Sequence, residues 1–314
     1  MKRRHFIQST GVAAGAMLAA PSVFTACSAK DPMARIGLTT VVFPTRFLST
    51  NPDASDDLLT LDKIPEFYQD RFGIYQCEFW SEHFESRSPS YLKDLKASLD
   101  LNHCTLINIQ ADTPGSDMSN PETSNAALAI QDIMEWIDVG AALGSKMVRG
   151  SFMQYSLEMG IKSMKKLVKY AKSKGITLLC ENHFDLMSIP ENHVKVAQEI
   201  GKDHFGLLAD FGNYPESTNK YKALEMIAPY TQLVSAKTHG YDENYEHTDF
   251  DFDRCVRIME EGGYSGIYSL EQWENGLPDY DYEKIVDWMI EHVKTNIGYD
   301  KTLSQLPGKQ SHSY

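Results

Sequence analysis

Residues 157–180, LEMGIKSMKKLVKYAKSKGITLLC, decide the fold class of this chain because they contain a helix and the strand that follows it. Apolar side chains recur at steps of four and three over residues 157–171, with lysines between them, which predicts an amphipathic helix. Gly175 ends that helix. The apolar run 176–180 shows no polar alternation, as is typical of a strand buried on both faces of a parallel sheet. The stretch therefore predicts one α/β unit.

The same alternation repeats along the chain from about residue 34, without a linker or low-complexity tract. Short apolar runs predict eight strands, at 36–43, 74–80, 105–110, 146–150, 176–180, 205–209, 233–237 and 267–270. Helical patterns follow at 58–70, 89–101, 122–143, 157–171, 190–200, 222–229, 251–262 and 281–296. Eight β/α units predict one α/β domain, a (β/α)8 TIM barrel spanning residues 34–314. A doubly wound sheet is disfavoured because no GxGxxG loop follows the first strand.

Residues 1–30 have the pattern of an export signal. The segment KRRHFI at residues 2–7 resembles a twin-arginine signal, and the apolar stretch 12–24 falls short of the ~20 residues that span a bilayer. The segment FTAC, which ends at Cys27, resembles a lipoprotein processing site. We therefore expect an exported protein, either periplasmic or anchored in the membrane as a lipoprotein, with a lipid on Cys27 as its only membrane link.

The net charge of −13 for 314 residues opposes nucleic-acid binding, which depends on clustered Lys and Arg. No basic cluster or phosphate-binding glycine loop follows the last two predicted strands. A small uncharged molecule is therefore the expected partner. The sequence gives no indication of the oligomeric state.

Strong metal ligands stand at the ends of the four last predicted strands: Glu181, Asp210, His239 and Glu271. Their separations of 29, 29 and 32 residues each correspond to one β/α unit. Because all strands of a barrel end at the same rim, the four side chains are expected to converge there. A single carboxylate at a strand end is commonly only a loop cap, but four in register predict a divalent cation. Three carboxylates with one imidazole suit Mn²⁺ or Mg²⁺ best, with Co²⁺ or Zn²⁺ as alternatives.

Further polar and aromatic residues near the predicted rim are candidates for substrate contact. Lys237 lies two residues before His239 and so shares its face of the strand. Its ammonium group either polarises a substrate ketone or neutralises the carboxylates. Trp80, His83, His183 and Trp273 are candidate walls of a sugar-binding site.

Several short motifs together resemble one family, the xylose-isomerase-like barrels that include sugar isomerases, ketose epimerases and AP endonucleases. The motifs are CENH at 180–183, DFGN at 210–213, KTH at 237–239, LE at 270–271 and EFW at 78–80. The resemblance implies a single metal ion bound by the four ligands above, with the first and last glutamates also moving protons. It covers nearly all of the chain after the signal.

The sequence also departs from that family. Asn213, a candidate substrate contact, stands where many epimerases of the family have a His, and the Arg that often follows the strand-seven His has no counterpart. Simple ketose 3-epimerisation is therefore disfavoured. The additional His ligands of the AP-endonuclease branch are also missing from the sequence.

These observations predict a divalent-metal-dependent isomerase or epimerase acting on an unphosphorylated sugar or keto-sugar. A metal-bound carbonyl makes the neighbouring C–H acidic, and Glu181 and Glu271 flank the substrate as proton acceptor and donor, with Lys237 assisting. Two alternatives stay open. The same site suits β-elimination by a 3-keto-glycoside lyase, and a barrel without catalysis would be a carbohydrate-binding protein.

Overall fold

The computed structural model describes residues 31–53, 57–150, 153–273 and 281–298, all within one compact unit. The predicted signal and Cys27 lie outside the described residues, so export stays a prediction. Among the helices that are described, none is both long and apolar enough to cross a membrane.

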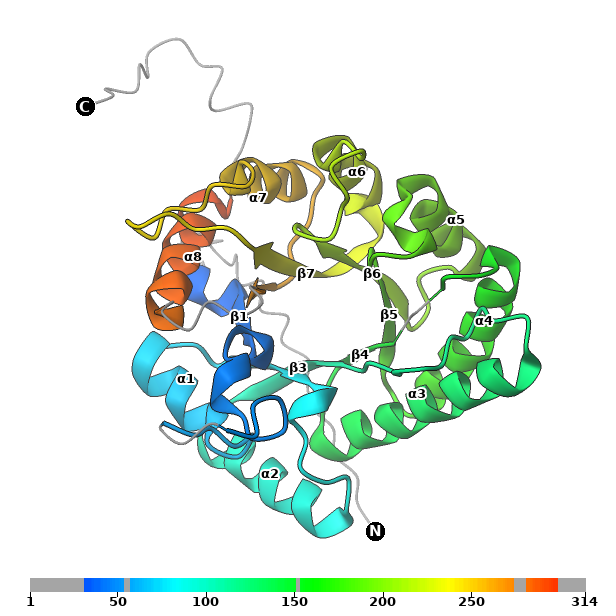
Figure 1. Ribbon diagram of the computed structural model, residues 1–314, viewed down its shortest axis with the longest axis horizontal. Coiled ribbons are helices and arrows are strands. Elements are labelled where there is room, and N and C mark those ends of the chain that lie inside the picture. The colour runs from blue at the N-terminus through cyan, green and yellow to red at the C-terminus, as the bar shows by residue number, and fades with distance from the viewer. Residues whose placement is uncertain (1–30, 54–56, 151–152, 274–280, 299–314) are drawn as a thin grey trace, which may run out of the picture. The chain divides into compact units, whose positions relative to one another are not determined.

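Eight strands form a closed parallel barrel in which every strand pairs with its sequence neighbours (Figure 1). The barrel closes where β1 pairs with β8, with Ile36 opposite Tyr268 and Leu38 opposite Leu270. The strands are β1 (Ile36–Thr39), β2 (Gln76–Trp80), β3 (Thr105–Gln110), β4 (Met147–Arg149), β5 (Thr177–Glu181), β6 (Phe205–Asp210), β7 (Thr231–Thr238) and β8 (Tyr268–Gln272). The predicted (β/α)8 TIM barrel is confirmed.

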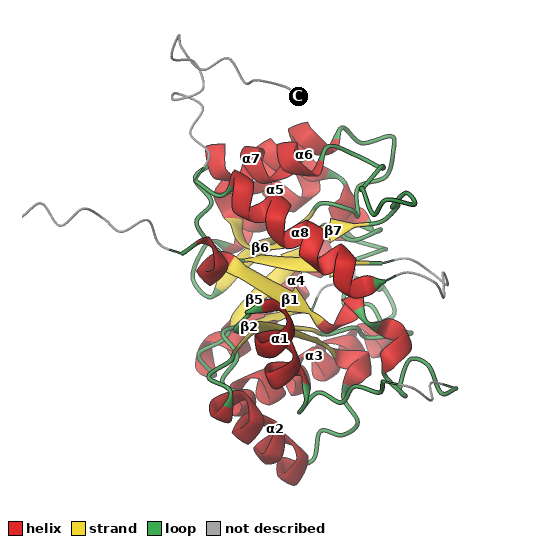
Figure 2. Cartoon of the chain, turned by 90° about the vertical axis from the view of Figure 1, so that its left-hand side faces the viewer, coloured by secondary structure: helices red, strands yellow, loops and turns green. Residues whose placement is uncertain are grey.

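Helices surround the barrel on its outside, as the side view shows (Figure 2). They are α1 (Ile64–Phe72), α2 (Pro89–Leu101), α3 (Thr123–Leu143), α4 (Leu157–Ser173), α5 (Pro190–Ile200), α6 (Lys220–Ile227), α7 (Phe252–Glu261) and α8 (Tyr282–Asn296). In α4, the Ser156 side chain accepts a hydrogen bond from the backbone N–H of Met159 and caps the first turn. Its apolar stripe, which includes Ile161 and Leu167, is buried against the barrel.

Two predicted elements differ from the structure. The first strand was predicted over 36–43, but it ends at Thr39, whose hydroxyl accepts from the N–H of Val41 and turns the chain into a short 3-10 helix. The first helix was predicted over 58–70 but spans Ile64–Phe72, because Pro65 lies in its first turn, where proline favours a helix start.

Candidate active site

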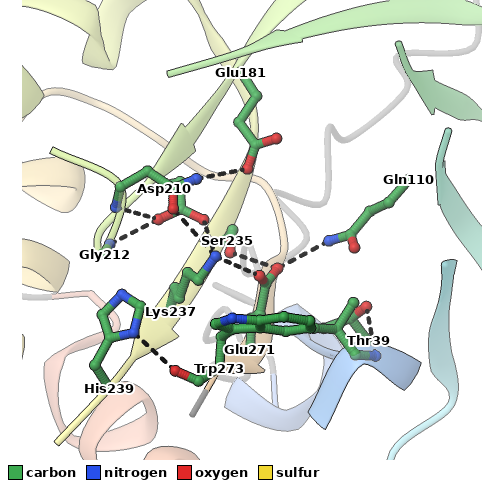
Figure 3. A network of polar contacts seen from close by, with 12 residues as sticks. Thr39, Gln110, Glu181, Asp210, Gly212, Ser235, Lys237, His239, Glu271 and Trp273 are labelled. Carbon is green, nitrogen blue, oxygen red and sulfur yellow. Dashed lines mark hydrogen bonds and ion pairs between the residues drawn. The ribbon is translucent and has the colours of Figure 1, made fainter. Parts of the chain in front are cut away.

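A ring of buried charged side chains lies at the carboxyl ends of β5 to β8 (Figure 3). Glu181 and Asp210 are the last residues of β5 and β6, and Glu271 is the last but one of β8. Lys237 pairs directly with Glu271 in the β7–β8 register. Glu181, Asp210 and Glu271 thus lie around Lys237, either in direct contact with its ammonium or connected to it through Asn213.

Lys237 is surrounded by three acceptors. Its Nζ lies 3.0 Å from Glu271 Oε1, 3.1 Å from Asn213 Oδ1 and 3.9 Å from Asp210 Oδ2. Burial alone lowers the pKa of a lysine, but the charges of Glu271, Asp210 and Glu181 outweigh it and raise the pKa of Lys237. The ammonium form is therefore the stable one in this site.

Glu271 is the carboxylate held most firmly. Its Oε2 accepts hydrogen bonds from Gln110 Nε2 at 2.9 Å and from Ser235 Oγ at 3.0 Å. Burial alone raises the pKa of Glu271, but Lys237 and these donors outweigh it and lower the pKa. Asp210 behaves in the opposite way: burial is the largest influence and, with the charges of Glu271 and Glu181, raises its pKa against the opposing effects of Lys237 and the Gly212 N–H.

A second buried cation, Arg149 at the end of β4, was not singled out from the sequence. Its Nε lies 3.0 Å from Glu181 Oε2, and its Nη1 donates to Asp112. Asp112 also accepts from Trp80 Nε1 at 2.7 Å. The sequence does contain a sign of this residue, because Arg149 lies in the strand segment MVR at 147–149. A charge buried in a strand is stable only beside a partner of opposite charge.

A cavity of about 240 Å³ opens above this ring. Lys237, Glu271 and Arg149 line it together with Trp80, Trp273 and His183. The indole rings of Trp80 and Trp273 meet edge to face with centroids 5.8 Å apart. The site thus offers charged groups below and apolar faces beside them, which suits a small polyhydroxylated molecule.

Two of the predicted substrate contacts do not line this cavity. His83 is 1% exposed, stacks on Phe47 with ring centroids 3.8 Å apart, and its Nδ1 lies 2.9 Å from Thr40 Oγ1. Burial lowers the pKa of His83 to about 3, so it is a neutral packing residue.

Asn213 is fully buried and connects two residues of the site. Its Oδ1 accepts a hydrogen bond from Lys237, and its Nδ2 donates one to Glu181 Oε1 at 3.2 Å. The side chain of Glu181 is also absent from the cavity lining and forms an ion pair with Arg149.

Binding of a metal ion by the four predicted ligands stays a prediction, and the structure places the Lys237 ammonium among three of them. Within the described ranges, which include all four residues, no group of three or more His, Cys, Asp or Glu side chains is arranged to hold a metal ion. Asp210 Oδ2 is buried without a hydrogen-bond donor, which would suit a cation, but the nearby cation is the Lys237 ammonium. His239 lies two residues beyond the position that faces Glu271, and its Nδ1 contacts the Trp273 carbonyl at 2.9 Å. The Nδ1 contact leaves Nε2 of His239 as an acceptor, so the feature that does not fit a divalent ion is the Lys237 ammonium beside Asp210 and Glu271.

The fold and site together define a class: a (β/α)8 barrel with a charged, aromatic-walled cavity at the carboxyl ends of its strands. Residues 71–292 match the family described as xylose isomerase-like TIM barrel. The chain belongs to this family. No curated protein sequence matches the chain significantly.

Solved structures of sugar epimerases share the fold at low sequence identity. L-ribulose 3-epimerase superposes with a TM-score of 0.66 and 15% identity, over 88% of this chain and 99% of that one. A D-tagatose 3-epimerase-like protein gives 0.64 and 19%, over 84% and 99%. The 3-keto-D-glucoside 4-epimerase from E. coli gives 0.61 and 14%, over 81% and 98%.

Proposed function

We propose that this chain is a sugar isomerase or epimerase that moves a proton next to the carbonyl of an unphosphorylated sugar or keto-sugar. The observation that carries the proposal is the Lys237–Glu271 pair, an ammonium and a carboxylate 3.0 Å apart on the wall of one cavity. The structural neighbours that act on ketoses and on a keto-glucoside support the same class of substrate.

In the proposed reaction, Glu271 accepts the proton from the carbon beside the ketone. The electron pair of the broken C–H bond forms a C=C bond, and the carbonyl oxygen gains negative charge. Lys237 donates a hydrogen bond to that oxygen, which is the role of an oxyanion-stabilising group. Protonation of the same carbon from the opposite face needs a second donor, for which Glu181 is the predicted residue, and gives an epimer. Return of the proton by Glu271 to the neighbouring carbon gives an isomer.

The loop after β7 favours a substrate without phosphate. The loop after β7, residues 240–251, contains five acidic residues and no Lys or Arg. A phosphate group close to this loop would meet repulsion, and Lys237 and Arg149, the cations that line the substrate cavity, are already paired with carboxylates. An unphosphorylated substrate also agrees with the export that residues 1–30 predict.

A 3-keto-glycoside lyase is the second candidate, because a larger cavity adjoins the ring. It has a volume of about 790 Å³ and is lined by Gly212, His239 and the segment 214–221. Gly212 is in contact with the Lys237 stem: a Cβ built there would lie 3.0 Å from Lys237 Cδ. A leaving aglycone would have room in this cavity, and Lys237 could protonate its oxygen after β-elimination.

Proton exchange followed by NMR tests the proposal. The protein is incubated in D₂O with keto-sugars and with 3-keto-glycosides. Deuterium at one α-carbon without aglycone release supports the isomerase or epimerase, and aglycone release supports the lyase. Glu271→Gln is expected to lower exchange by at least about a hundredfold, the scale of losing a positioned base. Lack of exchange on every substrate would contradict both enzymes and favour a carbohydrate-binding barrel.

A further inference from the structure

We propose that the Lys237 ammonium takes the place of a bound divalent cation in this barrel, so that the site carries its own positive charge and works without a metal ion. The catalytic part of this inference rests on the proposed function. The part that concerns metal affinity stands on the site geometry alone.

The strand register places Lys237 in the ring. Glu181 pairs with Leu208, and the next inward position on β6 is Asp210. Asp210 pairs with Ser235, and the next inward position on β7 is Lys237, which pairs with Glu271. Lys237 therefore continues the step from strand to strand that the three carboxylates define.

His239 lies outside this progression. It is two residues past the partner of Glu271, beyond the end of β7. Its Nε2 is packed against Gly212, so closely that a Cβ on that residue would come within 2.6 Å. Its Nδ1 contacts the Trp273 carbonyl, which accepts a hydrogen bond and so fixes the ring. This contact leaves Nε2 as the acceptor nitrogen, so it is the position of His239 beyond Lys237, and not the hydrogen bond, that separates the imidazole from the ring.

The contacts of Lys237 are those that a small cation would make. Its Nζ lies within hydrogen-bond distance of Asn213 Oδ1 and Glu271 Oε1, and Asp210 Oδ2 adds a negative charge 3.9 Å away. A divalent ion bound to the same carboxylates at about 2.0–2.2 Å would lie against this ammonium and be repelled by it. The carboxylates can therefore hold either the Lys237 ammonium or a divalent ion in this space, but not both.

The chemical task of a metal ion in this class of reaction is also available to Lys237. A Lewis acid stabilises negative charge on the carbonyl oxygen while the neighbouring carbon loses its proton. Lys237 lines the cavity beside Glu271 and can donate a hydrogen bond to that oxygen. The electrons and atoms balance without a co-reactant, because the proton that Glu271 accepts is later returned to the substrate.

Metal affinity is the first test, and it does not depend on activity. The wild-type protein and the Lys237→Met variant are titrated with Mn²⁺ by calorimetry, and the metal bound after dialysis is counted by mass spectrometry. Met keeps the length of the stem and removes the charge. Lys169→Met, on the exposed face of α4, is the matched control. Circular dichroism checks that each variant folds.

We expect substoichiometric metal in the wild type and the control, and a saturable Mn²⁺ site in Lys237→Met. Proton exchange by the wild type should be unchanged by a chelator, whereas Lys237→Met without metal should lose about a hundredfold or more. Stoichiometric Mn²⁺ in the wild type, with exchange abolished by the chelator, would overturn the inference. Since that result requires exchange, it differs from failure of the proposed function, which is lack of exchange with or without metal.

Discussion

Glu271 and Glu78 are both buried in the barrel, but their partners differ in charge. Glu271 pairs with the Lys237 ammonium, whereas Glu78 accepts hydrogen bonds from the neutral side chains of Asn108 and Ser269. Burial therefore dominates at Glu78 and raises its pKa to about 7 from 4.5. The folded protein holds a proton there that the unfolded chain has already lost.

This difference predicts how stability depends on pH. Between pH 4.5 and about 7 the folded state binds more protons at Glu78 than the unfolded state, so stability falls as pH rises. The loss at higher pH amounts to about 3 kcal/mol at most, at 1.36 kcal/mol per pKa unit. Urea denaturation across this range should show a flatter profile for Glu78→Gln. Glu243→Gln, exposed in the loop after β7, is the control, and equal profiles for both variants would contradict the assignment.

The residues of the candidate site were only partly predictable from the sequence. The carboxylates Glu181, Asp210 and Glu271 follow from polar residues at strand ends, and the structure brings them together. The choice between Lys237 and His239 depends on the register of β7, which shifts at Leu207/Leu208 on its neighbour β6. A register shift leaves no mark in hydrophobic periodicity, so the sequence does not show that Lys237, and not His239, lies opposite Glu271.

At the scale of the element, a proline in the first turn marked two helix starts correctly, although the start of α1 was missed despite Pro65. Both α2 and α5 begin as expected, at Pro89 and Pro190. What the sequence could not show is how closely α3 approaches the barrel. Gly140 in this helix faces β4, and a Cβ there would lie 2.8 Å from Val148 Cγ2. The side chain of Val148 is β-branched and fully buried, so it cannot move aside easily.

Gly140→Ala should therefore destabilise the protein although alanine favours helices. The propensity gain of about 1 kcal/mol is outweighed by overpacking of about 1–3 kcal/mol, so we expect a net loss of about 1 kcal/mol in the free energy of unfolding. Urea denaturation measures it. Leu128→Ala on the same helix, at a side chain 62% exposed, should change little. A stabilised Gly140→Ala variant would show that α3 shifts freely.

At the scale of the whole molecule, the first and last units of the barrel are joined by more than strand pairing. Arg35, just before β1, donates to both carboxylate oxygens of Glu260 in α7 and to the carbonyls of Tyr264 and Gly266. Tyr268 in β8 donates to the same carboxylate. The contacts of Arg35 connect segments more than 220 residues apart in the sequence.

Removing this connection should weaken the closed barrel. Arg35→Met leaves Glu260, whose side chain is 6% exposed, without its cation, and we expect a loss of about 3 kcal/mol in unfolding free energy. Arg87→Met removes an ion pair whose arginine is 42% exposed and should cost less than about 1 kcal/mol. Thermal and urea denaturation compare the two variants. Similar losses would mean that Arg35 acts only as a surface charge.

The ammonium of Lys237 is covalently attached to β7, unlike an ion that must be taken up from the surroundings. It reaches its position when the strands assemble and departs only when they separate. A protein equipped in this way would be complete as soon as it folds, in any compartment, and its competence would not vary with the supply of scarce ions or with competitors that sequester them.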